Sequence, residues 1–482
     1  MTWIMAVETL YYIIVGLAIT IPALSLVGGK HNRVYKGLAW IAVLSAIAAN
    51  SIMLYAASSP IEFFGGAVVH DRFTSFIALA ASLAAAISLL ASGKAPLEWP
   101  SSPAFYSLLP LVLLGVFVVS GAVDTFTVIA SWLLLSVLAY VYVALPYDRE
   151  SRAAAVRYIL LGAIATLFLA LWVAFNSMVS TTENLSPFAI SVLTDTSLSG
   201  LALMSVIAAV GFKTGVVPFH WWLPSVYGRA EGRVISVVAS IIKLGFIALL
   251  ARTLYLMAGG TVAGHNILAV ASPLAVNKAA AVLAVLAVAT MTYGNIAALT
   301  TDRLKALLAY SSIAQVGYIL AAIAALAYFA PSNSDFAKYA MAAIAVQAAA
   351  YGIAKSALFP LTESADKIAS LRGLRSTSPR ASAATAILLL SLLGMPPMLG
   401  FWGKLFMFIA AAGYSVILVV AAFLNSAISS GYYARFARDV LSGEPEGEPP
   451  SIDPSVEASL LVAATLILAL GFIAPILFLL AL

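Results

Sequence analysis

Long apolar stretches constrain this chain more than any other feature. About fourteen of them follow one another along the 482 residues, each near the roughly 20 residues that an α-helix needs to cross a bilayer. They lie near 4–28, 35–57, 72–92, 103–122, 125–145, 154–176, 198–224, 234–257, 276–299, 304–329, 336–361, 382–410, 413–434 and 456–480. Backbone polar groups inside hydrocarbon must be paired within the segment, which favours helices. The sequence therefore predicts an all-α integral membrane protein with about fourteen transmembrane helices.

The amino-acid composition excludes several kinds of cofactor and metal site. Hydrophobic residues make up 63% of the chain and charged residues 9%, whereas a soluble domain has about a quarter charged residues. The sequence contains no cysteine, which excludes cysteine-ligated iron–sulfur clusters, c-type haem attachment and thiolate zinc sites. It also lacks the glycine-rich motifs that bind nucleotides. We expect no cofactor, metal or nucleic-acid partner for this chain, and any electron transfer to occur in other subunits.

The basic residues predict an orientation. Of the 25 lysines and arginines, 17 follow odd-numbered helices. They are Lys30, Arg33, Lys36, Lys94, Arg149, Arg152, Arg157, Arg229, Arg233, Arg303, Lys305, Lys367, Arg372, Arg375, Arg380, Arg435 and Arg438. The opposite side holds only Arg72, Arg252, Lys278 and Lys338. By the positive-inside rule, the odd-numbered loops face the cytoplasm and both termini face outward across the cell membrane.

Four lysines remain, and all lie within apolar stretches: Lys213, Lys243, Lys355 and Lys404. A charged side chain at the bilayer centre costs about 2.5–3.5 kcal/mol on insertion scales. Lysine, unlike arginine, can release its proton when it is desolvated. We therefore interpret these lysines as proton carriers. The alternative is that an ammonium reaches the interface along its flexible stem, and Lys355, close to the polar cluster that starts at Thr362, suits that reading best.

Two of the apolar stretches are interrupted by proline. The seventh contains "KTGVVPFHWWLP", with Pro218, and the twelfth contains "LLGMPPMLGFWGKLFMF", with Pro396 and Pro397. A single break would be an ordinary kink, but paired broken helices with one lysine each are typical of transporters built from inverted repeats. Because the two are five helices apart, we predict repeats of helices 4–8 and 9–13. His220 follows Pro218 and is either a helix contact or a proton carrier, since imidazole titrates near neutral pH.

This layout divides the chain into four segments. We predict N-terminal helices 1–3 over 1–100, a first repeat over 101–257, a second repeat over 258–440, and a polar loop with a last helix over 441–482.

Five passages carry a resemblance to a known family. They are "GFKTGVVPFHWWLP", "IIKLGFIALLAR", "DRLKALLAYSSIAQVGYIL", "KSALF" and "SLLGMPPMLGFWGKLFMF". With them, the chain resembles the antiporter-like membrane subunits of respiratory complex I (NADH:quinone oxidoreductase), of Mrp-type cation/proton antiporters and of membrane-bound hydrogenases. The resemblance implies fourteen helices with two inverted five-helix repeats, the seventh and twelfth being broken.

The resemblance also implies roles for individual residues. Lys213 matches the family's broken-helix lysine, Lys243 its lysine of helix 8, and Lys404 the lysine or glutamate of helix 12. Gln315 stands where many members carry histidine and others glutamine, and Lys355 matches a Lys-Ala-Leu-Leu-Phe motif. We take Lys213, Lys243 and Lys404 as the proton path and His220, Gln315 and Lys355 as secondary candidates.

One departure from the family concerns helix 5. Members of the family carry a glutamate there that pairs with the helix 7 lysine, and an ungapped match places Leu133 at that position. The carboxylate partner of Lys213 is then missing from this chain. Either the first repeat conducts with altered coupling, with or without an acid from a neighbouring subunit, or it is inert and the chain is retained as a membrane scaffold.

Three hypotheses follow. The first is a proton-translocating subunit of a complex I-like or hydrogenase-like oxidoreductase, whose partners are the bilayer and other membrane and redox subunits. The second is an Mrp-type sodium/proton antiporter subunit. The third is a non-conducting structural subunit of a membrane arm.

Overall fold

The computed structural model describes residues 2–27, 32–56, 59–94, 96, 99, 101–183, 196–262, 271–332, 335–445 and 450–481. Lys30, counted above among the basic residues, lies outside them. The helices are α1 (Thr2–Val27), α2 (Asn32–Ala56), α3 (Arg72–Ala91), α4 (Ser102–Ser107), α5 (Leu109–Gly121), α6 (Thr125–Ala144), α7 (Arg149–Glu183), α9 (Thr196–Thr214), α10 (Trp222–Tyr227), α11 (Gly232–Ser236), η3 (Val237–Ile242), α12 (Lys243–Met257), α13 (Pro273–Thr300), α14 (Leu304–Phe329), η4 (Ala330–Ser332), α15 (Asp335–Leu361), η5 (Ala369–Leu371), α16 (Leu374–Thr377), α17 (Pro379–Leu393), α18 (Leu399–Tyr414), α19 (Val416–Leu441) and α20 (Pro454–Ala481).

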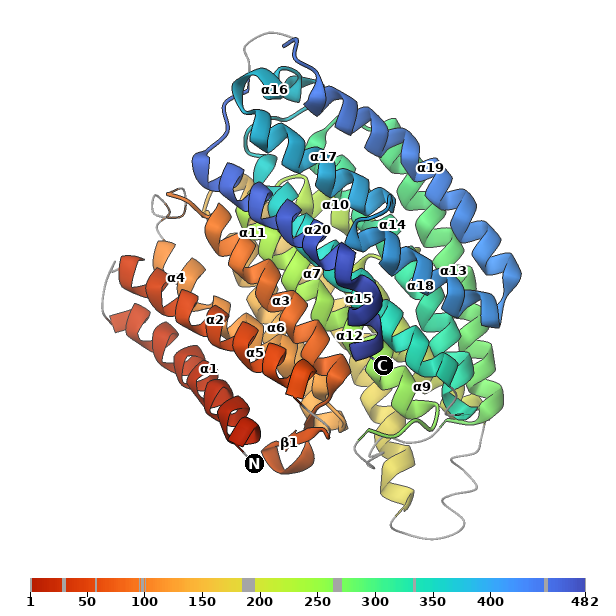
Figure 1. The fold of residues 1–482 in the computed structure, drawn as a ribbon. Helices are drawn as coiled ribbons and strands as arrows, with labels where there is room; N and C mark the ends of the chain where they lie inside the picture. Colours follow the sequence, from red (N-terminus) through yellow and green to blue (C-terminus); the bar gives the residue numbers. More distant parts are fainter. Residues whose placement is uncertain are drawn as a thin grey trace.

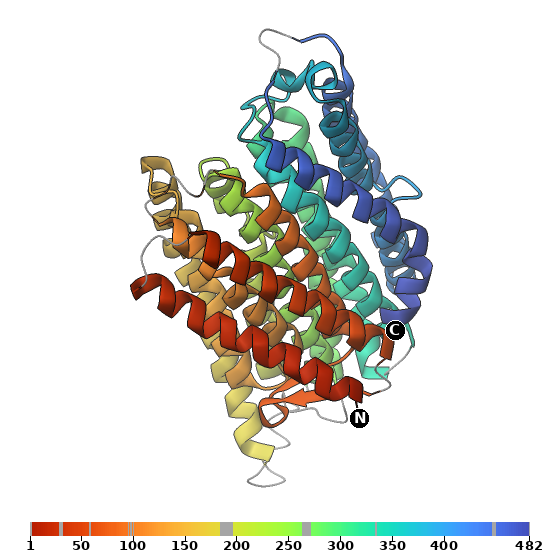
Figure 2. The same ribbon diagram turned by 60° about the vertical axis from the view of Figure 1, so that its left-hand side comes forward.

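The predicted all-α membrane fold is confirmed. Thirteen helices in the described residues are long and apolar enough to cross a membrane. The expected twelfth span is present as two shorter apolar helices, α17 and α18. Together they give the expected fourteen membrane-spanning elements, which run side by side in Figures 1 and 2. The chain is an integral, multi-pass membrane protein.

Three helices form the centre of the bundle. The most apolar 18-residue stretch of Gly232–Met257 and that of Asp335–Leu361 are buried along their whole length, and that of Leu304–Ser332 is 89% buried. In α1, α7 and α19 the corresponding stretch is only about a third buried or less. The central helices α12, α14 and α15 carry Lys243, Gln315 and Lys355. Two of the four lysines in apolar stretches therefore lie on the central helices, while Lys213 and Lys404 lie on α9 and α18.

The two predicted helix breaks are present and have the same construction. α9 ends at Thr214 and α17 at Leu393, and each is followed by a glycine in the left-handed region, Gly215 with φ 84° and Gly394 with φ 95°. The next N–H then donates to the carbonyl five residues back, from Val216 to Gly211 at 2.8 Å and from Met395 to Leu390 at 3.0 Å. This double-bonded cap satisfies the last carbonyls of a helix and needs a residue without a Cβ at its turn.

A short β-hairpin, which the hydropathy pattern did not predict, precedes α3. β1 (Ile61–Phe63) pairs antiparallel with β2 (Val68–His70), with Ile61 opposite His70. The turn contains Gly65 and Gly66, both at positive φ. A glycine pair between short apolar segments is a recognised hairpin signal, so this element could have been found in the sequence.

The hairpin leads to a buried ion pair. Asp71 directly follows β2 and caps α3 by accepting from the Thr74 N–H. Both of its carboxylate oxygens also accept from Arg252, at 2.7 and 2.8 Å. The sequence placed Arg252 on the side opposite the odd-numbered loops, and its partner Asp71 lies in the connection between α2 and α3. Arg252 lies within α12 and is 2% exposed, because the carboxylate compensates its charge inside the bundle.

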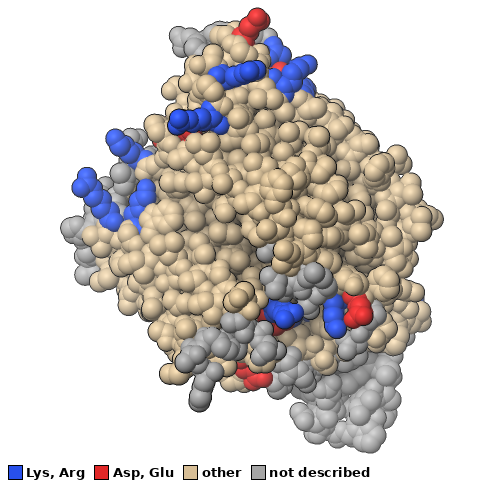
Figure 3. All heavy atoms as spheres, viewed as in Figure 1, with Lys and Arg blue, Asp and Glu red and all other residues tan. Residues whose placement is uncertain are grey.

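The odd-numbered loops lie at one end of the bundle and are tied to one another. Ion pairs join them: Arg229 with Glu150, Lys305 with Glu363, Arg435 with Asp302, and Arg372 with Asp439. Figure 3 shows lysines and arginines gathered at this end, while the centre of the same face shows no charged side chain. The N-terminus of the chain, at the start of α1, and its C-terminus, at the finish of α20, lie toward the end of the bundle opposite α16 (Figures 1 and 2).

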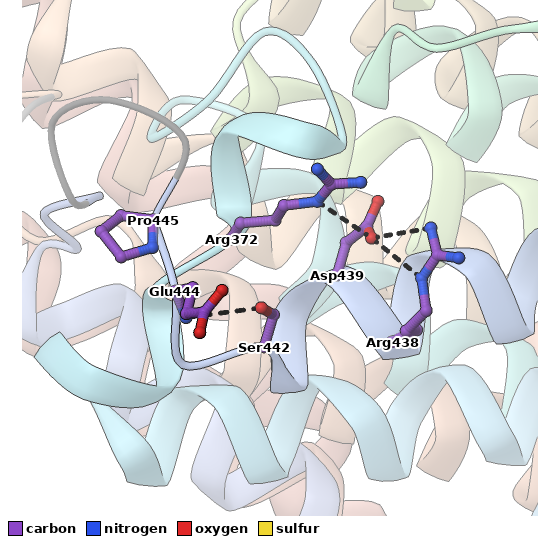
Figure 4. Close-up of a pocket in the computed structure, with 6 residues that line it drawn as sticks. All are labelled: Arg372, Arg438, Asp439, Ser442, Glu444 and Pro445. Atoms are coloured by element: carbon purple, nitrogen blue, oxygen red, sulfur yellow. Dashed lines mark hydrogen bonds and ion pairs between the residues drawn. The ribbon is translucent and has the colours of Figure 1, made fainter.

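A cavity of about 280 Å³ opens at this basic end, between the loop that carries η5 and the end of α19. Asp439 accepts there from both Arg372, at 3.3 Å, and Arg438, at 3.0 Å (Figure 4). The ion pair between Arg372 and Asp439 in this cavity connects the loop after α15 to the end of α19.

Candidate functional site: a buried lysine axis

Lys213 sits in the last turn of α9, immediately before the first helix break. It is 2% exposed. Its ammonium donates a 2.6 Å hydrogen bond to the Tyr140 hydroxyl on α6. The nitrogen lies 4.5 Å from the centre of the Tyr140 ring and 5.6 Å from that of Tyr158 on α7. The group is therefore held inside the bundle by a neutral acceptor and aromatic faces.

Aromatic side chains connect Lys213 with Lys243. Tyr158 stacks on Trp222 of α10, with ring centres 4.7 Å apart, and Trp222 meets Tyr227 edge-on at 6.2 Å. The Tyr227 ring centre lies 5.5 Å from the Lys243 nitrogen. The short helix after the first break thus bridges the surroundings of the two lysines.

Lys243 begins α12 directly after η3, a turn of π-helix. It is 2% exposed, and its nitrogen has no hydrogen-bond partner in the described part of the chain. The Tyr351 ring of α15 lies 5.9 Å from it. The Ser236 hydroxyl donates to the Ser356 carbonyl at 2.7 Å and ties this region to α15. π-Turns interrupt the regular i→i−4 ladder and are frequent at functional sites.

Lys355 lies on α15 directly before Ser356, whose carbonyl accepts from Ser236 beside η3. The Lys355 side chain is 0% exposed. The ammonium donates to the Leu308 carbonyl at 2.9 Å and, through a very short bond, to the Ser311 hydroxyl, both on α14. Because these bonds lie inside the bundle, the alternative in which Lys355 reaches the interface is wrong.

Gln315 connects the Lys355 region to the second helix break. Its amide nitrogen donates to the Leu392 carbonyl at 2.9 Å and to the Tyr433 hydroxyl at 3.3 Å. Ser311, the partner of Lys355, lies one turn before Gln315 on the same helix. On the other side, the Gln347 amide donates to the Gln315 carbonyl oxygen at 2.9 Å.

Lys404 lies on α18, the helix that follows the second break, and reaches back to the helix before it. Its ammonium donates to the Leu393 carbonyl at 2.8 Å and to the Ser426 hydroxyl at 3.1 Å, and it lies 4.6 Å from the Tyr318 ring centre. The last carbonyls of a helix carry partial negative charge. The break in this span therefore supplies the acceptor that holds the lysine. Gly394 leaves room for it, since a Cβ there would lie 2.9 Å from the Lys404 Cδ.

The proline positions and His220 lie nearer the surface. Pro218, Pro396 and Pro397 are exposed, whereas the lysines of both broken helices are buried. His220 is half-buried, with its ring centre 4.0 Å from that of Tyr293. Its Nδ1 has no hydrogen-bond partner in the described residues. A role for His220 on the proton path stays a prediction.

Leu133 occupies the outer face of α6. It is 44% exposed and forms a stripe with Phe126, Val137 and Val141, all of them exposed. The α6 residues beside Lys213 are instead Trp132 and Tyr140, on the face that packs inside the bundle. The structure thus does not turn Leu133 toward Lys213, and its equivalence to a family glutamate stays a prediction from the ungapped match.

The aromatic partners of the lysines were missed in the sequence. A signal was present, because Trp132, Ser136 and Tyr140 repeat every four residues and so share one face of a helix. In a sequence this apolar, however, aromatic residues at helical spacing also fit ordinary packing.

We call Lys213, Lys243, Lys355 and Lys404, with the side chains that link them, the lysine axis. Comparisons with known proteins show the family of the chain. A family described as "NADH:quinone oxidoreductase/Mrp antiporter, TM" matches residues 122–429, which include all four lysines. The chain belongs to this family. The resemblance inferred from the five sequence passages is therefore confirmed.

The relatives match over nearly the whole chain. NADH-quinone oxidoreductase subunit N of Rubrobacter xylanophilus is 30% identical and covers 92% of this chain and 90% of its own length. NADH-quinone oxidoreductase subunit N 2 of Roseiflexus castenholzii is 31% identical, with 97% and 93% covered.

Solved structures give the same fold. A chain of respiratory complex I from Thermus thermophilus with bound aureothin superposes with a TM-score of 0.76 at 26% identity, covering 97% of this chain and 98% of that one. A chain of the Mrp complex from a Dietzia species has a TM-score of 0.78 at 18% identity, covering 98% and 96%, and this likeness concerns the fold alone.

Proposed function

We propose that this chain is a proton-translocating membrane subunit of a complex I-like oxidoreductase. Its partners are the other membrane and redox subunits of that assembly, and the electrons are transferred in those subunits. The observation that carries the proposal is the lysine axis, in which four buried ammonium groups follow one another on α9, α12, α15 and α18. Among the described residues none of the four forms an ion pair with a carboxylate. The relatives named as NADH-quinone oxidoreductase subunit N support the choice of assembly.

The axis suits proton transfer because three of its four lysines are held by groups that can exchange a hydrogen bond without moving the backbone. Lys213 and Lys355 donate to hydroxyls, and Lys404 donates to a hydroxyl and a carbonyl. Protons pass between them through polar side chains and the water among these. Redox chemistry in the partner subunits drives the transfer by changing the charge near one end of the axis.

The decisive experiment uses the assembled complex reconstituted in vesicles, with protons translocated per electron as the readout. Lys243→Ala and Lys404→Ala each lower this ratio while subunit content stays constant. Lys338→Ala is the matched control, because the side chain of this lysine is 54% exposed and pairs only with the exposed Asp335 in the described residues. If both variants retain the ratio of the unmodified complex, the chain is a structural element of the membrane arm and the proposal fails.

The orientation completes the proposal. The odd-numbered loops face the cytoplasm and both termini face outward, as the 17 basic residues of those loops favour. Because the sequence has no cysteine, single cysteines report sidedness without background. Gly443→Cys should react with an impermeant maleimide only from the cytoplasmic side, and Ser332→Cys only from the outside.

A further inference from the structure

Four aromatic rings surround the ammonium of Lys213. Its nitrogen lies 4.5 Å from the ring centre of Tyr140, 5.5 Å from those of Trp132 and Phe246, and 5.6 Å from that of Tyr158. These rings come from three helices, α6, α7 and α12. No other lysine in the described part of the chain lies over as many rings.

The same ammonium has no anionic partner. None of the ion pairs between described residues involves Lys213, and its hydrogen bond goes to the neutral Tyr140 hydroxyl. A buried ammonium without compensation is strongly disfavoured. The negative face of an aromatic ring attracts a cation, and the attraction grows when water is excluded. Four such faces together with a charge-assisted hydrogen bond are the compensation that the structure provides.

The position of Tyr140 is itself fixed by its surroundings. Its ring meets Tyr158 edge-on at 4.9 Å and 87°. Gly162, on α7, makes the space for its hydroxyl, because a Cβ at Gly162 would overlap that oxygen. The glycine is helical and buried, and the atoms nearest to the position of its missing Cβ all belong to Tyr140, so packing of Tyr140 accounts for the absence of a side chain there.

We propose that Tyr140, Trp132, Tyr158 and Phe246 form an aromatic cage that serves Lys213 in place of a carboxylate, with Tyr140 as the positioning residue that orients its Nζ. The proposal rests on the proposed proton-translocating function and adds the residues that make its first lysine usable. Under it, the first half of the chain conducts without an acid from a neighbouring subunit.

The test compares variants in the reconstituted complex, again by protons translocated per electron. Tyr140→Phe keeps the ring and removes the acceptor, and it should lower the ratio by about as much as Lys213→Ala. Phe246→Leu removes one negative face at similar volume and should give a smaller loss. Gly162→Ala displaces the Tyr140 hydroxyl without altering any group that touches Lys213, and it should reproduce the effect of Tyr140→Phe.

The matched control is Tyr142→Phe. Tyr142 lies on the same helix, is fully buried and donates to the Phe105 carbonyl at 2.8 Å, so it reports the loss of a buried tyrosine hydroxyl away from Lys213. If Tyr140→Phe, Phe246→Leu and Gly162→Ala all match Tyr142→Phe, the cage is overturned. That result leaves the proposed function standing if Lys404→Ala still lowers the ratio. If neither Lys404→Ala nor Lys243→Ala lowers the ratio, the proposed function itself fails. If Tyr140→Phe does not assemble, Phe246→Leu and Gly162→Ala decide the question.

Discussion

The buried ion pair between Asp71 and Arg252 gives a prediction whose size follows from the structure. The guanidinium is 2% exposed and makes four hydrogen bonds, two to the Asp71 carboxylate at 2.7 and 2.8 Å, one to the Thr74 hydroxyl at 3.0 Å and one to the Ser120 carbonyl at 3.1 Å. Asp71→Asn keeps one acceptor oxygen, removes the negative charge and turns an amide N–H₂ group toward the guanidinium. The charge of Arg252 is then buried without compensation.

Breaking a buried pair by removing one partner costs about 3–5 kcal/mol. The Asp71 side chain is 21% exposed, so solvent screens part of that cost, and we expect a loss near the lower limit, about 3 kcal/mol. Burial alone would raise the pKa of Asp71, but the charge and hydrogen bonds of Arg252 outweigh it and hold the pKa below its usual range. The contribution is therefore present at neutral pH and is lost only as the pH falls through that lowered value.

The assay is thermal unfolding of the purified protein in detergent at pH 7. Asp71→Asn should lower the midpoint by several degrees, while Asp335→Asn, which breaks the exposed pair with Lys338, should change it little, since such pairs contribute about 0–1 kcal/mol. Adding Arg252→Met to Asp71→Asn should recover part of the loss, because it removes the unpaired charge. Equal midpoints for the two single variants would refute the reasoning.

Three further predictions concern the loops, the packing and α6. Burial, together with the charge of Glu363, raises the pKa of Glu231 to about 7 against the opposing charge of Arg233. The native state therefore keeps this proton at pH values where the unfolded chain has released it. The free energy of unfolding should fall by about 1–3 kcal/mol as the pH rises toward 7. Glu231→Gln should make the melting midpoint less dependent on pH over that range. Gly317→Ala places a Cβ 2.5 Å from a backbone nitrogen of α13, and it should lower the stability of the detergent-solubilised protein by about 1–3 kcal/mol. Leu133→Glu puts a charge on the exposed face of α6 and should reduce the amount of assembled subunit, whereas Ser136→Asp, on the buried face, should assemble if Lys213 accepts it as a partner.

The fold was predictable because its main signal is local. A span of about 20 apolar residues is identified without knowing its neighbours, and a proline inside such a span identifies the break. The central position of α12, α14 and α15 was not predictable, because these helices are as apolar as those that face lipid. Only the packing distinguishes them.

The candidate site was predictable as a set of residues but not as an arrangement. A lysine in an apolar span stands out by its chemistry, and so Lys213, Lys243, Lys355 and Lys404 were all identified. Their partners are tyrosines, serines and backbone carbonyls, which are common in membrane helices and acquire a role only from where the helices cross. Arg252 shows the same limit, because its burial depends on Asp71, which lies 181 residues earlier in the chain.

The surroundings of Lys213 affect how far its charge is felt. An ammonium facing a carboxylate forms a dipole, whose field decays quickly with distance, whereas an ammonium among neutral rings acts as a monopole. At a separation of about 10 Å and an effective dielectric constant of about 20, a unit charge shifts the energy of another by about 1.7 kcal/mol. A proton on Lys213 would therefore change the occupancy of a basic group at that separation more than tenfold.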